Sequence, residues 1–147
     1  FLRFYKAALF VAKGLDALTG GASAKILEEE GKQVDALREG RAFVAFDMIA
    51  DSTSFRWFAK GEGETIAVMG ESLPFGKETR LVALSPFPCR FTVVQDGAEA
   101  HQAEGRTLDW TPPGPGKYRV EAELNVAGKW TPWVYANPIE LRNKSEQ

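Results

Sequence analysis

The chain has 147 residues, 44% hydrophobic and 26% charged, with 18 Lys and Arg against 20 Asp and Glu and a formal net charge of -2. This size suits one domain with a short appendage, and the balanced charge argues against a nucleic-acid partner because no basic excess is present to neutralise phosphates. One histidine and one cysteine exclude an internal disulfide framework and a Cys/His zinc cluster, so no metal and no other cofactor is expected in this chain.

Residues 1–40 form the first predicted region, a helical connector of one or two helices. Apolar side chains recur there at helical spacing, and Gly40 is a stop signal. Charged residues interrupt residues 1–18, and the longest apolar run between them is far too short to span a bilayer. We therefore expect no membrane span here, but an amphipathic helix docked on the fold. Phe1 is not a natural initiator, which indicates processing or a piece of a longer chain. The cellular compartment is not indicated.

The second predicted region, residues 41–142, contains short alternating runs separated by turn residues. This pattern is typical of an antiparallel β fold, and we expect a mainly β protein of about nine strands, an immunoglobulin-like β-sandwich. A polar tail, residues 143–147, follows. The expected strand runs are residues 42–48, 54–60, 65–69, 80–84, 90–95, 98–102, the short 107–110, 117–124, 130–136 and 139–142.

Two stretches carry strong turn signals. Asp96-Gly97 predicts a tight hairpin, because a primed turn needs positive φ. Residues 85–88, with the sequence Ser-Pro-Phe-Pro, predict a turn between two strands, because proline cannot donate to a ladder. Residues 47–54 are expected to form the first hairpin loop.

His101 and Cys89 are unique in the chain and therefore the first candidates for chemistry. A general base needs a nucleophile and an orienting partner. The sequence indicates neither for His101, so we expect a histidine at the surface or rim. A reactive thiol needs a lowered pKa and a partner base. Arg90 beside Cys89 is weak support, and a buried structural thiol is the favoured interpretation.

Asp47, Asp51 and Glu71 are the nearest approach to a carboxylate cluster. Paired carboxylates bind calcium or perform acid–base chemistry. Aspartates in loops more often bond to their own backbone, and we favour that interpretation. The glycine-rich residues 61–64 do not lead into a helix, so a phosphate-binding loop is not expected.

The four tryptophans divide into two pairs. Trp57 and Trp133 lie inside predicted strands and are expected in the core. Trp110 and Trp130 lie near turns and are the candidates for ligand or interface contacts. Exposed rings on a β-sandwich can stack on sugars, so a module that binds a glycan or another cell-envelope ligand is one alternative, although packing is favoured.

Two stretches of the sequence together resemble a known family. The first is VDALREGRAFVAFD at residues 34–47, and the second is GKYRVE at residues 116–121 followed by WVYANPI at residues 133–139. Their order resembles the region after the catalytic domain in bacterial PHP-family proteins (polymerase and histidinol phosphatase family), predicted metal-dependent phosphoesterases. In that family an ALR-GR-YVAFD segment leads into a β-sandwich that ends in W-SNPIY, and here Ala136 and Glu140 depart from the serine and the tyrosine. The family-like residues are Gly40, Arg41, Asp47, Gly70, Asp96, Gly97, Tyr118, Arg119, Trp133, Asn137 and Pro138.

Each of these positions also has a physical interpretation without catalysis. Gly40 fits a helix carboxyl-terminal cap, after which Arg41 is expected to bond to exposed carbonyls. Arg119 and Glu121 share one strand face and are expected to form a solvated or interface pair. Asn137-Pro138 is expected to end one strand and redirect the chain.

The resemblance implies a role outside the chemistry. The PHP catalytic centre holds its metals with several His and Asp or Glu side chains. This chain has one histidine, so no catalytic residue and no metal ligand of the family can be assigned to it. We therefore expect a C-terminal accessory domain, not an enzyme by itself, whose partner is the catalytic domain of its parent and which packs on that domain or shapes access to it. A domain that forms a homodimer through its N-terminal helix is the other alternative.

Overall fold

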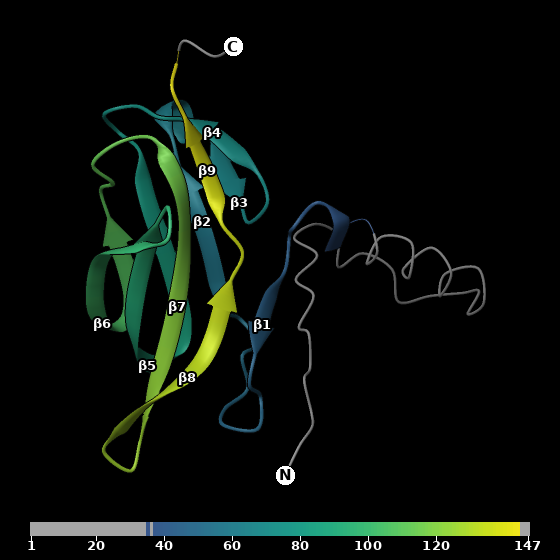
Figure 1. Cartoon of the computed structure of the whole chain (residues 1–147), viewed down its shortest axis with the longest axis vertical. Coiled ribbons are helices and arrows are strands. Elements are labelled where there is room, and N and C mark those ends of the chain that lie inside the picture. Colours follow the sequence, from purple (N-terminus) through teal and green to yellow (C-terminus); the bar gives the residue numbers. More distant parts are fainter. Residues whose placement is uncertain (1–34, 36, 145–147) are drawn as a thin grey trace, which may run out of the picture.

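The structure is a computed structural model that describes residue 35 and residues 37–144. Most of the helical connector predicted for residues 1–40 lies outside the described residues, and so does the N-terminal helix of the homodimer alternative. Nine strands are present in the described part, all within residues 41–142 (Figure 1). They are β1 (Phe43–Ala45), β2 (Arg56–Lys60), β3 (Ile66–Val68), β4 (Ser72–Pro74), β5 (Arg80–Gln95), β6 (Ala98–Trp110), β7 (Gly116–Val126), β8 (Lys129–Ala136) and β9 (Ile139–Arg142), with a 3-10 turn, η1 (Glu62–Glu64), between β2 and β3.

The strands form one sheet that curls into a half-barrel (Figure 1). Its main path runs β1-β8-β7-β5-β2-β3, with β6 beside β5 and with β9 between β7 and β4. All strand pairs are antiparallel except β4 and β9, which are parallel. The prediction of a mainly β protein is confirmed. The immunoglobulin-like division into two sheets is not confirmed, because ladder hydrogen bonds join all nine strands.

The curl of the sheet comes from a corner in the middle of β5. Leu84 pairs with Thr107 and Cys89 pairs with Gly105, so the residues between them form a large bulge. The part of β5 before the corner pairs with β2, and the part after it pairs with β7. The predicted turn at residues 85–88 is therefore wrong. Its two prolines lie where the ladder is already interrupted, so their missing N–H groups cost no pairing.

Strand β6 follows the same bend, and its two predicted runs are one strand. The rings of His101 and Trp110, near the two ends of β6, stack with their centroids 5.1 Å apart and their planes 4° from parallel. Both rings are half-buried, so the prediction that His101 lies at the surface or rim stays a prediction.

The core lies inside the curl and follows the predicted alternation on β2 and β7. On β8 the alternation fails, because Trp133 and Val134 are both buried. The register of β7 with β8 shifts at Ala122 and Glu123, and such a bulge turns two successive side chains to the same face. The largest buried side chains are Trp57, Trp133, Tyr118, Phe43, Phe55 and Phe91.

Two features of the pairing were not predicted. Residues 47–54 do not close a hairpin, because β1 pairs with β8 whereas β2 pairs with β3 and β5. Strand β4 is absent from the prediction, and its partner β9 lies far along the chain. Both follow from contacts between distant residues, which local sequence pattern does not encode. No helix in the described residues is long and apolar enough to cross a membrane.

Candidate functional site

Several family-like residues meet at one junction, where the chain enters the sheet before β1. The side-chain amide of Asn137 donates to the carbonyl of Gly40 at 3.0 Å, and its backbone N–H donates to the carbonyl of Ala42 at 3.2 Å. The backbone N–H of Gly70 donates to the carbonyl of Pro138 at 2.9 Å. The incoming chain is therefore bonded to the β8–β9 turn, and the β8–β9 turn is bonded to the β3–β4 turn.

Glycine is required at position 70 for two reasons. Its φ is +80°, in the left-handed region, and a Cβ built there would lie 1.8 Å from the carbonyl oxygen of Glu39. Gly40 also has a positive φ, +71°, as expected for a residue that ends a helical turn. Arg41 pairs with the carboxylates of Glu39 and Glu71 rather than with backbone carbonyls, which corrects the expectation for this side chain.

A second group of family-like residues forms the β5–β6 hairpin. Asp96 and Gly97 have φ values of +48° and +90°, so the predicted primed turn is confirmed. Asp96 also accepts a hydrogen bond from the backbone N–H of Lys117 at 3.0 Å, which ties the turn to β7. The hydroxyl of Tyr118 donates to the carbonyl of Gly114 at 2.7 Å, and burial raises the pKa of this tyrosine.

A third group orders the segment between β1 and β2. Asp47 accepts hydrogen bonds from the backbone N–H and the hydroxyl of Ser52, at 3.1 and 2.7 Å. The indole N–H of Trp133 donates to the carbonyl of Ala50 at 2.9 Å. The interpretation of Asp47 as a loop residue that bonds to its own backbone is confirmed. Within residues 35 and 37–144, no three His, Cys, Asp or Glu side chains lie close enough to hold a metal ion.

Two ion pairs involve the outer face of β7. Arg119 pairs with Glu121 at 3.0 Å, as predicted. Arg90, on β5, donates from Nε to Glu123 at 2.9 Å, and its guanidinium carbon lies 4.7 Å from the centre of the Trp130 ring. These contacts fix side chains across neighbouring strands.

Neither candidate tryptophan presents a free ring. Trp110 is stacked on His101 and meets the edge of Tyr118, and Trp130 lies under the guanidinium of Arg90. Both are half-buried. The aromatic rings that the sequence singled out are thus occupied by contacts within the chain.

Cys89 is buried at the start of the second part of β5, as predicted. Burial raises the pKa of its thiol from 9.0 to about 11. The thiol is therefore protonated at neutral pH and is a poor nucleophile.

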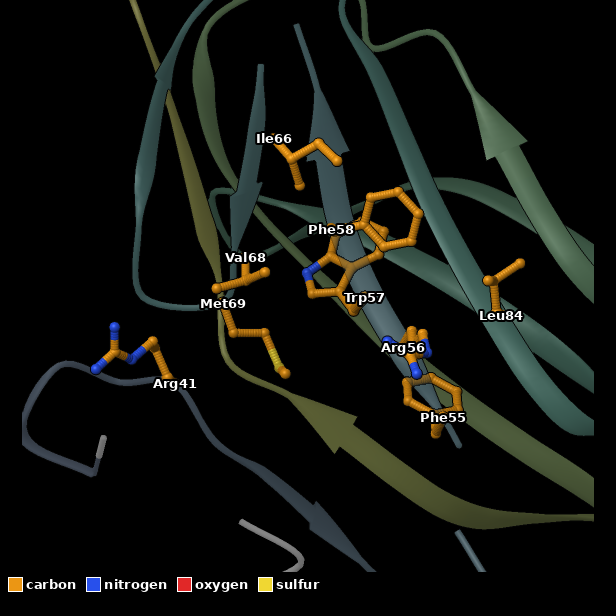
Figure 2. A pocket seen from close by; sticks show the side chains of 9 residues that line it. All are labelled: Arg41, Phe55, Arg56, Trp57, Phe58, Ile66, Val68, Met69 and Leu84. Atoms are coloured by element: carbon orange, nitrogen blue, oxygen red, sulfur yellow. The ribbon is translucent and has the colours of Figure 1, made fainter. Parts of the chain in front are cut away.

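The structure adds a feature that the sequence interpretation missed, a pocket of about 290 Å³ beside β2 and β3. Figure 2 shows side chains from β2 and β3 around this space, together with residues just before β1 and β2, just after β3 and on β5. A signal was present, because Phe58 and Val68 are apolar at positions that face away from the core and are paired across the strands. The lining residues are Arg41, Phe55, Arg56, Trp57, Phe58, Ile66, Val68, Met69 and Leu84.

One of the lining residues, Trp57, has an unusual polar atom. Trp57 is 2% exposed, and its indole nitrogen finds no hydrogen-bond partner among the described residues. In Figure 2 this nitrogen points toward Val68 and Met69. Buried donors are almost always paired, so an unpaired one calls for an explanation.

Comparisons with known proteins do not extend these observations. No family model matches the sequence, and no significant match is found among curated proteins or solved structures. The resemblance to the PHP family therefore depends on the sequence stretches quoted above.

Proposed function

We propose that the chain is a non-catalytic accessory domain of a PHP-family metal-dependent phosphoesterase, which packs on the catalytic domain and shapes access to it. The observation that carries this proposal is the junction of Gly40, Gly70 and Asn137. Immediately before β1 the chain is bonded to the β8–β9 turn, which is itself bonded to the β3–β4 turn. A chain held at Gly40 and Ala42 enters the sheet in one direction at these residues, as a linker to a neighbouring domain would need.

The family-like residues support an architectural role. Those at the junction hold the incoming chain, and Asp96 holds the β5–β6 turn against β7. Tyr118 holds the loop between β6 and β7, and Asp47 and Trp133 hold the segment between β1 and β2. All of these contacts are within the fold. The sugar-binding alternative receives no comparable support, because the rings of Trp110 and Trp130 are engaged within the chain.

We also propose that the half-barrel corresponds to an immunoglobulin-like sandwich whose two faces share β5 and β6. The two parts of β5 have different neighbours, β2 before the corner and β7 after it. Cutting the sheet at the corner would give two faces that enclose one core. An experimental structure that shows no such facing arrangement would contradict this assignment.

Two measurements test the accessory role. The 147-residue chain is assayed for hydrolysis of bis(p-nitrophenyl) phosphate with added Mn²⁺ or Zn²⁺, and no metal-dependent turnover is expected. The chain is then mixed with a separately produced PHP-family catalytic domain and examined by sedimentation velocity, where a complex is expected. Metal-dependent turnover by the chain alone, or the absence of a complex, contradicts the proposal.

A variant at the junction sharpens the binding experiment. Asn137→Ala removes the amide that holds the Gly40 carbonyl, so the orientation of the incoming chain should relax and the complex should weaken. Asn125→Ala, which removes an amide that accepts from Gly128 in the β7–β8 turn, is the matched control and should leave the complex unchanged.

A further inference from the structure

We propose that residues 1–18 fold back onto their own sheet and cover an exposed apolar surface beside β1, with residues 1–6 at the contact. This inference is independent of the accessory role, because it concerns a contact within one chain. The surface is made of four large apolar residues that we call the β1 patch: Val44, Met48, Ile49 and Tyr135.

The members of the β1 patch are exposed and adjoin one another. Met48 is 80% exposed, Val44 45%, Tyr135 39% and Ile49 36%. Val44 and Tyr135 are directly opposite each other on β1 and β8, and the rings of Phe46 and Tyr135 meet with their centroids 6.4 Å apart. The N–H of Ile49 donates to the carbonyl of Phe46 at 2.9 Å, which places the loop residues next to the strand residues. Single exposed apolar side chains are normal, whereas a contiguous group of them marks a contact surface.

The neighbouring outer face of β7 shows how a solvated part of this sheet is built. There Arg119 pairs with Glu121, and Arg90 pairs with Glu123. The β1 patch has no charged member, and β1 is the end of the main strand path, with β8 as its partner. The described residues therefore leave an apolar surface uncovered at this edge of the sheet (Figure 1).

The chain that precedes β1 reaches this edge through a helical turn. The N–H of Glu39 donates to the carbonyl of Asp35 at 2.9 Å, and that of Gly40 donates to the carbonyl of Leu37 at 3.1 Å. In the sequence, Ser23 is the predicted start of this helix, and the glycines at positions 20 and 21 separate it from the predicted helix of residues 1–18.

The lengths of the two predicted helices bring the start of the chain back to β1. With a rise of about 1.5 Å per residue, residues 23–39 span about 26 Å and residues 1–18 span about 27 Å. Two helices joined by a short turn pack antiparallel. Because the helices are of nearly equal length, residues 1–6 return to the level of Gly40, close to the start of β1 at Phe43.

Residues 1–6, with the sequence Phe-Leu-Arg-Phe-Tyr-Lys, complement the patch in apolar character and in charge. Three carboxylates lie in or beside the segments that form the patch: Asp47 precedes Met48, Asp51 follows in the same loop, and Glu121 is opposite Tyr135 on β7. Arg3 and Lys6 have the opposite sign. A second copy of the patch would bring carboxylates face to face, so the charges favour the chain's own first residues as the occupant.

The chain contains two methionines, Met48 in the patch and Met69 in the core, and the second provides an internal reference. Methyl signals of the 147-residue chain, labelled with ¹³C at methionine, are recorded with and without a soluble gadolinium chelate. If residues 1–6 cover the patch, the chelate should broaden the Met48 signal as little as that of Met69, which is 6% exposed. Strong broadening of Met48 in the unaltered chain overturns the proposal.

A charge placed in the patch should release the segment. Val44→Glu should increase the broadening of Met48 by the chelate about tenfold, because the segment loses an apolar contact and meets a further carboxylate. Val126→Glu is the matched control, because Val126 is 46% exposed against 45% for Val44 and lies at the end of β7, and it should leave Met48 protected. The Met69 signal reports that each variant is folded. Equal protection of Met48 in the two folded variants overturns the proposal.

A spin label on Ala7→Cys tests which segment covers the patch, and the buried Cys89 stays unlabelled. The label should broaden Met48 within the same chain, and reduction of the label with ascorbate should restore the signal. A mixture of spin-labelled chain without ¹³C and ¹³C-labelled chain without the spin label should show no such broadening. Broadening in the mixture identifies a second copy as the occupant and overturns the proposal, as does a Met48 signal that the label leaves unchanged within its own chain.

Discussion

Trp57 and Trp133 occupy equivalent depths on different parts of the sheet, yet their surroundings differ. Trp133, on β8, is covered by the segment between β1 and β2, whose Ala50 carbonyl accepts its indole N–H at 2.9 Å. Trp57, on β2, has an open space beside it and an unpaired N–H. On the β8 side of the core, a backbone carbonyl of the chain accepts the buried indole N–H. On the β2 side, the described residues provide no acceptor for the corresponding N–H.

The largest effect is expected at the junction next to the pocket. Gly70→Ala places a methyl group 1.8 Å from the Glu39 carbonyl oxygen, so the junction must open, and we expect a loss of about 4 kcal/mol in the free energy of unfolding. Gly97→Ala is the control, because its φ is +90° but no atom lies within 4 Å of the added carbon. It should lose only about 1 kcal/mol, the cost of the left-handed backbone. Urea denaturation measures both, and similar losses would show that the junction is not tightly packed.

The second effect concerns the corner that separates the two parts of β5. The folded state keeps the Cys89 thiol protonated up to about pH 11, whereas an unperturbed thiol ionises near 9.0. The unfolded state is therefore the first to lose the proton. The contribution of the thiol to stability should be constant below pH 9 and fall by about 2 kcal/mol between pH 9 and 11.

The Cys89→Ala variant isolates this contribution of the thiol. Tyr118 and Tyr135 also have a raised pKa and remain in the variant, so the difference between the two pH profiles reports Cys89. Unfolding is followed by fluorescence across the pH range. Parallel profiles for the two proteins would mean that the thiol is accessible to water in the folded state.

The third effect tests the two tryptophans directly. Trp133→Phe loses its hydrogen bond and leaves the Ala50 carbonyl without its donor, whereas Trp57→Phe removes a donor that was unpaired. Because the two rings are equally buried, the loss of volume is similar and the difference reports the hydrogen bond. Trp133→Phe should be more destabilising by about 2 kcal/mol, measured by urea denaturation. Equal losses would indicate that Trp57 has an acceptor in solution.

The smallest effect is expected on the outer face of β7, away from both tryptophans. Arg90→Lys keeps the charge near Glu123 but loses the planar group over Trp130, at a cost of about 1 kcal/mol. A shift in the emission of Trp130, referred to a Trp130→Phe variant, checks that this ring has been uncovered. An unchanged emission spectrum would show that the guanidinium does not cover the ring.

Local signals in the sequence predicted the local parts of the fold. The Asp96-Gly97 turn, the alternation of β7 and the burial of Cys89 each depend on neighbouring residues, and each is confirmed. The corner of β5 was taken for a turn because prolines at positions 86 and 88 interrupt pairing, whereas the wider sheet keeps the strand continuous there.

The sites depended on contacts that sequence pattern does not specify. Gly40, Gly70 and Asn137 were singled out individually, but their meeting at one junction follows from the placement of three separate turns. The unpaired nitrogen of Trp57 was not predictable, because it depends on which backbone carbonyls happen to face the ring. Phe58 and Val68, apolar on an outer face, were the available signal for the pocket.

The position of β9 has a consequence for the order of folding. This last strand joins β4 through the pair Ser72 and Glu140, and it joins β7 through the pair Gly116 and Leu141. During synthesis, β4 and the start of β7 cannot form their hydrogen bonds with β9 until the last residues of the sheet have been made. Contacts between residues so far apart form slowly, so a nascent chain stopped just before residue 139 should expose two open edges and aggregate more readily than the finished chain.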